Sequence, residues 1–360
     1  MDTPGDRRAF FKDLFGSVAK GALQIAPSLG HLERLAPSRD DDHDSEDALE
    51  PDFFDGPPQP APPSTKTATI VDLLRMAQEA GLAFRAPEIQ ALAQQSLRLT
   101  LGDDNKDTPG RSRFGGEPDL PAALEWPNFE DQPLTFLLQI DLAQLAALGV
   151  PGALPDAGVL LFFVKTDDTP SGLQVSDRGS GAVIVVEEPT ASIAQGAAAV
   201  DPDIADAVSG AVELSLSGEM TLPRLWTQPV EALELEPEEE AGWHDLREQL
   251  AAFQGVELED ISPNLNSLHR FLGHPDETRG DMPLVCELTA AGIDADDQPR
   301  AHPRIEEFQG PSQRWRLLLQ LTIDDDLGWS WGSDRDRLYF WIDADDWQAG
   351  DLSRVWIVAE

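Results

Sequence analysis

The hexapeptide "RFGGEP" at residues 113–118 returns as "RFLGHP" at residues 270–275. Two further segments follow each copy in the same order: "FLLQIDLAQL" (136–145) and "GVLLFFV" (158–164) after the first, "LLLQLTIDDD" (317–326) and "RLYFWID" (337–343) after the second. Three matched pairs in one order indicate an internal duplication. We therefore expect two related half-domains, at 97–200 and 260–360, with a pseudo-twofold between them.

Short strands and few helices are expected after Gly102. Apolar or alternating runs predict strands at 97–101, 136–140, 159–164, 182–186, 314–321, 338–342 and 355–358. Apolar residues at helical spacing predict helices within 67–81, from Pro87, at 141–149 and at 242–255. Because these strands do not alternate regularly with helices, the fold class is predicted to be α+β with largely antiparallel sheets.

We place the α+β domain at 67–360. An N-terminal extension precedes it. Residues 1–37 predict an amphipathic helix, and the acidic, proline-rich segment 38–66 has the composition of a disordered linker. The Arg7-Arg8 pair resembles a twin-arginine export signal. The charged residues Asp13 and Lys20 interrupt the apolar run that such a signal needs. A cytoplasmic location is therefore the main expectation, with export as the minor alternative.

The composition excludes several classes of protein. There are 66 acidic and 26 basic residues, which give a formal net charge of −40. This charge repels nucleic acid and anionic lipid and favours a basic partner. Cys286 is the single cysteine, so a disulfide framework is excluded and a reducing compartment is favoured. The sequence contains no apolar run approaching about 18 residues, so no integral membrane segment is expected.

The repeated segments also carry a family resemblance. "SRFGGEPDLPAALEWP", "PLTFLLQIDLAQL" and the stretch from "LLLQLTIDDD" to the C-terminus resemble the YwqG-like bacterial proteins, grouped as domain of unknown function 1963. The likeness spans roughly 97–360 and implies a soluble α+β fold. It assigns no activity, catalytic residue or cofactor, so no functional site is carried over.

Two interpretations of the first turn remain open. Arg111 and Arg113 with Gly115 and Gly116 can present guanidinium and amide groups to an anion. Alternatively, the glycines supply backbone angles closed to other residues while Trp126 fills the core. We favour the second, structural interpretation.

Other candidate chemistry is weak. His269 and His274 have a spacing unsuited to a helix-face ligand pair, so a metal site is not expected. Cys286 lies in the strand-like run "MPLVCELTA" and reads as a small apolar residue. No nucleophile elbow, zinc-protease motif or complete dinucleotide fingerprint is present, so neither a catalytic residue nor a cofactor is predicted.

The favoured hypothesis is a non-enzymatic, acidic protein-binding module for a basic partner, of which an immunity-like protein neutralising a basic toxin is one version. Its contact residues are expected at Trp329, Trp331, Asp334 and Arg335, because tryptophan and arginine are common in binding hot spots. The alternative is an enzyme or small-ligand binder with a site between the half-domains. That site would use Arg111 or Arg113, Gly115, Gly116, and His269 or His274.

Overall fold

The computed structural model describes residues 66–104, 108–150, 154–166, 169–189, 211–256, 269–278, 280–296, 298–322 and 337–360. All of them belong to one compact unit, residues 61–360. The predicted N-terminal helix (1–37) lies outside the described residues, as does the predicted linker (38–66) apart from Lys66. Among the described residues, no helix has both the length and the apolar character that crossing a membrane requires.

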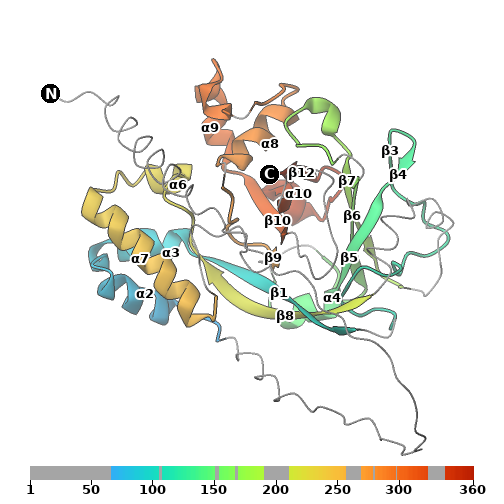
Figure 1. The fold of residues 1–360 in the computed structure, drawn as a ribbon, viewed down its shortest axis with the longest axis horizontal. Coiled ribbons are helices and arrows are strands. Elements are labelled where there is room, and N and C mark those ends of the chain that lie inside the picture. Colours follow the sequence, from blue (N-terminus) through green and yellow to red (C-terminus); the bar gives the residue numbers. More distant parts are fainter. Residues whose placement is uncertain are drawn as a thin grey trace, which may run out of the picture. The chain divides into compact units, whose positions relative to one another are not determined.

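Within these ranges, ten strands form a single sheet in which each neighbouring pair is antiparallel (Figure 1). The order is β12-β11-β10-β9-β1-β8-β2-β5-β6-β7. The strands are β1 (Gln94–Asp104), β2 (Arg113–Phe114), β5 (Thr135–Asp141), β6 (Val159–Val164), β7 (Gly181–Val186), β8 (Val212–Thr221), β9 (His269–Phe271), β10 (Trp315–Thr322), β11 (Arg337–Asp343) and β12 (Trp356–Ala359). A separate hairpin joins β3 (Asn128–Phe129) to β4 (Gln132–Pro133). The predicted α+β class with a largely antiparallel sheet is confirmed.

The two ends of the sheet meet through the segment that precedes β7. The Ala359 amide donates to the Ser171 carbonyl at 3.1 Å, and the Trp356 indole N–H donates to the Gly172 carbonyl at 2.9 Å. Gly172 has a φ of +79°, and a Cβ there would lie 1.9 Å from the Ile357 carbonyl oxygen. Only glycine fits this contact, so the approach of the two sheet ends depends on it.

The main core lies inside the curved sheet. The ring of Phe162 on β6 packs edge-on against Phe340 on β11, with centroids 5.3 Å apart, and against Phe271 on β9 at 6.5 Å. These three rings are fully buried. Strands from both halves of the sheet order therefore share one apolar core.

A layer of helices packs beside β1 and β8. It contains α2 (Ile70–Glu79), α3 (Ala86–Leu92) and α7 (Pro237–Phe253). Thr69 caps α2 in a reciprocal pair with Asp72. Gly242 of α7 lies so close to α2 that a Cβ would come within 2.5 Å of the Ala80 carbonyl oxygen. Trp243 is fully buried in the core between these helices.

The remaining helices cover other parts of the sheet. They are η1 (Ala83–Arg85), α4 (Leu142–Ala147), η2 (Val175–Asp177), α6 (Gln228–Glu231), α8 (Met282–Ala290), η4 (Pro299–Ala301), α9 (Ile305–Ser312) and α10 (Ala344–Ala349). Both α4 and α10 begin directly after a strand, where Asp141 and Asp343 accept hydrogen bonds from first-turn amides.

Most predicted elements are confirmed, and the structure adds several that were not predicted, among them β2, β9, α6, α9 and α10. The segment around Cys286 is helix α8 and not a strand, so that prediction was wrong. Residues 284–289 of α8 are all buried, so the sequence shows no alternation of apolar and polar residues at helical spacing. Helix α7 begins at Pro237, five residues before the predicted start at Gly242. Strand β8 is an addition to the predicted set, although "VELSLSGEMT" alternates apolar and polar residues as strands do.

Candidate functional site

Two turns with nearly the same sequence adopt the same backbone. We call residues 113–119 turn A and residues 270–276 turn B. Each turn places two consecutive residues at positive φ: Gly115 (65°) and Gly116 (69°) in turn A, Leu272 (62°) and Gly273 (81°) in turn B. The first residue of each pair donates its amide to a strand carbonyl, Gly115 to Leu137 of β5 and Leu272 to Leu318 of β10. The predicted structural role of Gly115 and Gly116 agrees with this geometry.

The polar contacts of the two turns also correspond. In turn A, Arg113 donates to the Glu117 carbonyl and to Asp119 Oδ1, the latter at 2.9 Å. The Asp119 amide then donates to Gln139 Oε1 on β5 at 3.1 Å.

In turn B, Arg270 donates to the His274 carbonyl at 2.9 Å and to Asp276 Oδ2 at 2.7 Å. The Asp276 amide donates to Gln320 Oε1 on β10 at 2.9 Å. One arginine, one aspartate and one strand glutamine thus hold each turn in place.

The charge of Arg113 is paired within turn A, although its buried Nε–H has no hydrogen-bond partner among the described residues. Arg113 is 2% exposed. Asp119 Oδ2 also accepts from the Gly110 amide at 2.6 Å and from Gln139 Nε2 at 2.7 Å. Burial alone would raise the pKa of Asp119, but hydrogen bonds from Arg113 and Gln139 outweigh it and lower the pKa. Both terminal guanidinium nitrogens of Arg113 are therefore already engaged within the turn.

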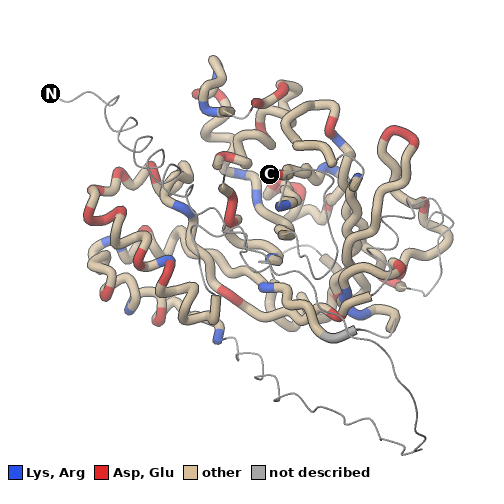
Figure 2. Tube along the Cα trace, in the orientation of Figure 1, with Lys and Arg blue, Asp and Glu red and all other residues tan. Residues whose placement is uncertain are grey.

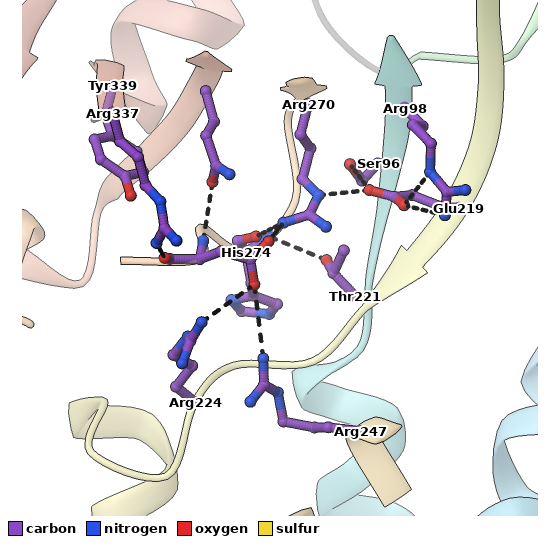
Figure 3. A network of polar contacts seen from close by, with 12 residues as sticks. Ser96, Arg98, Glu219, Thr221, Arg224, Arg247, Arg270, His274, Arg337 and Tyr339 are labelled. Carbon is purple, nitrogen blue, oxygen red and sulfur yellow. Dashed lines mark hydrogen bonds and ion pairs between the residues drawn. The ribbon is translucent and has the colours of Figure 1, made fainter. Parts of the chain in front are cut away.

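Turn B carries more charge (Figure 3). Arg224 and Arg247 each bring a guanidinium nitrogen near Asp276 Oδ1, at 3.8 and 3.7 Å. Beside them, Arg98 of β1 and Arg270 both pair with Glu219 of β8. Arg337 of β11 donates to the Asp276 carbonyl.

We call Arg98, Arg224, Arg247, Arg270, Glu219 and Asp276 the arginine cluster; it holds four positive and two negative side chains. Burial alone would raise the pKa of Asp276, but Arg270, Arg224 and Arg247 hold it well below its ordinary value. Glu219 shows the same balance with Arg270 and Arg98, so its pKa is also lowered. Both carboxylates are therefore ionised at neutral pH, and the cluster has an excess of two positive charges.

His274 is a neutral member of turn B. Its Nε2–H donates to the Leu92 carbonyl at 2.7 Å, which leaves Nδ1 as an acceptor. Burial lowers the pKa of His274 to about 4, and the nearby charges of Arg270, Arg247 and Arg316 act in the same direction. At physiological pH it therefore adds no charge to the cluster.

Two small cavities meet at His274. One, of about 40 Å³, is lined by Glu219, Arg247, Arg270, His274 and Asp276 together with apolar residues of β8 and α7. The other, of about 90 Å³, is lined by residues that include His274, Glu277 and Trp341. Burial raises the pKa of Glu277 to about 7, and the nearby Glu360 carboxylate contributes to this rise.

The predicted ligand residues fall in two separate places. Arg111 is exposed, and Arg113 with the two glycines forms turn A. His269 is buried, its ring 5.8 Å from that of Phe114, whereas His274 lies in turn B. Neither cavity at His274 is lined by Arg111 or Arg113. The structure therefore does not gather these residues around one of these cavities.

The predicted partner-binding residues Trp329, Trp331, Asp334 and Arg335 lie outside the described residues. Within the described part of the chain, no three His, Cys, Asp or Glu side chains gather in a way that can hold a metal ion.

The arginine cluster was not predicted from the sequence. One signal was available, since Asp119 and Asp276 both follow the proline of the repeated hexapeptide. Arg224 and Arg247 had no such signal, because they approach Asp276 only through the fold.

Comparison with known proteins bears on the same region. The sequence model of a protein family, the domain of unknown function DUF1963, matches residues 112–360. The chain belongs to the DUF1963 family. This match contains both turns and α7, whereas Arg98 on β1 precedes it. No curated protein matches the chain. The DUF1963 description gives no function, so the roles of these residues have to be argued from geometry.

Proposed function

We propose that this protein is a non-enzymatic, acidic protein-binding module that engages a basic partner. The observation that carries the proposal is the acidic surface. Six arginines turn inward, each with a side chain at most 14% exposed: Arg98, Arg113, Arg224, Arg247, Arg270 and Arg337. Their carboxylate partners are buried with them, so the surface keeps the strong acidic excess of the composition.

Among the described residues, a concentration of exposed carboxylates follows α6 and runs along α7 (Figure 2). We call it the acidic face; its exposed members are Glu234, Glu236, Glu238, Glu240, Asp245 and Glu248. The same helical layer exposes Val71 (78%) and Phe84 (65%). A basic partner with some apolar surface fits this combination, since complementary charge steers association and fixes orientation.

The buried reactive groups favour binding over catalysis. Burial raises the pKa of the Cys286 thiol well above its usual value, so the thiolate that a nucleophile needs is disfavoured. Burial also raises the pKa of Tyr339, whose hydroxyl donates to Glu360 at 2.7 Å. A single buried thiol fits a reducing compartment, and we retain the cytoplasm as the proposed location. An immunity-like role, neutralising a basic partner, is one version of this function.

We also propose that the chain contains two related half-domains, 97–200 and 260–360. The support is the matched geometry of the turns: the same positive-φ pair, the same arginine-to-aspartate contact and the same strand glutamine. A second parallel lies in the strands, since an irregularity in the ladder between β5 and β6 precedes Gln139 as one between β10 and β11 precedes Gln320.

A quantitative pull-down with the full chain tests the binding function. We expect captured proteins to be basic and to be released by high salt, because the attraction is electrostatic. A variant with Glu238→Gln, Glu240→Gln, Asp245→Asn and Glu248→Gln should capture much less. The matched control neutralises four exposed acids elsewhere: Glu125, Glu187, Glu188 and Glu306. Absence of any salt-sensitive basic partner, or equal loss in both variants, contradicts the proposal.

A further inference from the structure

We propose that a cavity of about 320 Å³, lined by β1, β8 and the end of α4, binds a small, neutral and mainly apolar molecule that carries a hydroxyl or similar uncharged polar group. This cavity is larger than the two at His274, which measure about 40 and 90 Å³. Ligand pockets commonly measure about 300–1,000 Å³, and an apolar cavity of about 150 Å³ is enough to bind benzene. No residue of the acidic face lines this cavity, so the inference is independent of the binding proposed for a basic partner.

A glycine in the sheet leaves space for this cavity. In the ladder between β1 and β8, Leu99 lies opposite Leu216. Two residues along β1, on the same face, Leu97 lies opposite Gly218, so no side chain of β8 fills the space beside it. A Cβ at Gly218 would lie 3.2 Å from Thr67 Oγ1, which donates to the Gly218 carbonyl at 2.7 Å. Glycine at 218 therefore leaves the space open and also lets the Thr67 hydroxyl line it.

The wall of the cavity is mainly apolar and comes from segments far apart in the sequence. Gly149, with a φ of +71°, turns the chain after α4, and its two neighbours both line the cavity. Turn B contributes Leu272, which has a φ of 62° where turn A has Gly115. Leucine is disfavoured in this conformation, so packing of its side chain against the main core and the cavity outweighs the backbone cost. The apolar wall consists of Ala68, Leu97, Ala147, Leu148, Val150 and Leu272.

The polar groups at the cavity favour an uncharged ligand. Glu219 is the one charged residue among the described residues that line it, and Arg98 and Arg270 both pair with Glu219. An anion would meet a carboxylate there, and a cation would meet a carboxylate whose charge is already balanced. The Thr67 hydroxyl oxygen can accept a hydrogen bond, and the exposed amide of Gln95 can donate or accept one. A hydroxyl group on an apolar body matches this combination.

Displacement of a neutral fluorescent probe, N-phenylnaphthylamine, from the full chain tests the proposal. We expect saturable binding of one probe per chain and displacement of that probe by hexanol. Hexanoate and hexylammonium have the same chain length but carry a charge, so they should require concentrations at least about tenfold higher, because the cavity offers their charge no partner. Probe binding that does not saturate, or displacement by either charged compound as readily as by hexanol, overturns the proposal.

Two matched pairs of variants locate the bound probe. Leu148→Glu places a carboxylate in the wall and should weaken probe binding at least about tenfold. Leu124→Glu changes a residue that is equally exposed (42%) but does not line the cavity, so it should leave binding unchanged. Ala147→Trp should also weaken binding by filling part of the cavity, whereas Ala146→Trp, at the exposed neighbour that does not line it, should not. All four positions are exposed, so the fold should tolerate the changes. Unchanged binding in Leu148→Glu and Ala147→Trp, or an equal loss in their controls, overturns the proposal.

Discussion

Turn A and turn B have the same backbone and different charge. In turn A one guanidinium meets one carboxylate, whereas turn B lies in a cluster of four arginines and two acids. Asp119 is held by Arg113, by the Gly110 amide and by the strand glutamine Gln139. Asp276 is instead surrounded by Arg224, Arg247 and Arg270, so the two turns balance the same carboxylate in different ways.

The residue that follows the shared aspartate also differs between the two turns. Leu120 follows Asp119 and is fully buried in an apolar cluster. Glu277 follows Asp276 and is also buried, at 2% exposure. An apolar side chain fills the position in one copy and an ionisable one lines a cavity in the other. The two turns therefore differ in the chemistry of this position.

The largest expected effect is at Arg113. Arg113→Gln removes the basic partner of a buried carboxylate, so it should lower the free energy of unfolding by about 4 kcal/mol. Arg270→Gln should cost less, because Asp276 keeps Arg224 and Arg247 and Glu219 keeps Arg98. Urea unfolding of both variants measures the difference. A larger loss for Arg270→Gln would show that turn B has no surplus of positive charge.

The next effect is the pH dependence caused by Glu277. Its pKa is about 7 in the folded chain and about 4.5 when unfolded, so the folded state binds the extra proton between these values. Stability contributed by the protonated carboxyl is present below pH 4.5 and is lost as pH rises to 7, by up to about 3 kcal/mol. Glu277→Gln should remove this slope in urea unfolding measured from pH 4.5 to 8. The exposed control Glu248→Gln should keep the slope; a variant at Glu277 that also keeps it refutes the assignment.

A smaller loss is expected at Gly273, where turn B packs against β1 and β8. A Cβ there would lie 2.6 Å from Ser96 Cβ and 2.8 Å from Thr221 Oγ1, at a φ of +81°. Gly255 has a similar φ of +71°, but a Cβ there would have no atom within 4 Å. Gly255→Ala therefore measures the backbone strain alone. Gly273→Ala should lower the free energy of unfolding by about 2 kcal/mol more than Gly255→Ala, as measured by thermal or urea unfolding. Equal costs would mean that the packing contact is unimportant.

The smallest of these effects is expected at Leu272, which occupies the position of Gly115. Leu272→Gly relieves a left-handed conformation but removes a partly buried side chain, so the free energy of unfolding should change by less than about 1 kcal/mol. Chemical denaturation measures this change. A loss well above that figure would show that the two turns differ in their backbone requirements.

Much of the fold could be predicted from local patterns of apolar residues, whereas the arginine cluster could not. Strands such as Val159–Val164 are continuous apolar runs, and the repeated hexapeptide marked both turns. Arg98, Arg224 and Arg247 are far apart in sequence, and their convergence depends on the pairing of β1 with β8 and on the docking of α7. Short-range periodicity carries no information on such contacts. The same limit made the buried helix around Cys286 resemble a strand.

Urea unfolding of Arg247→Gln tests most directly whether several arginines share the charge of Asp276 while Arg113 alone balances Asp119. We expect Arg247→Gln to lower the free energy of unfolding by less than Arg113→Gln does, since Arg270 and Arg224 still pair with Asp276. A loss as large as that of Arg113→Gln would contradict this difference between the two turns.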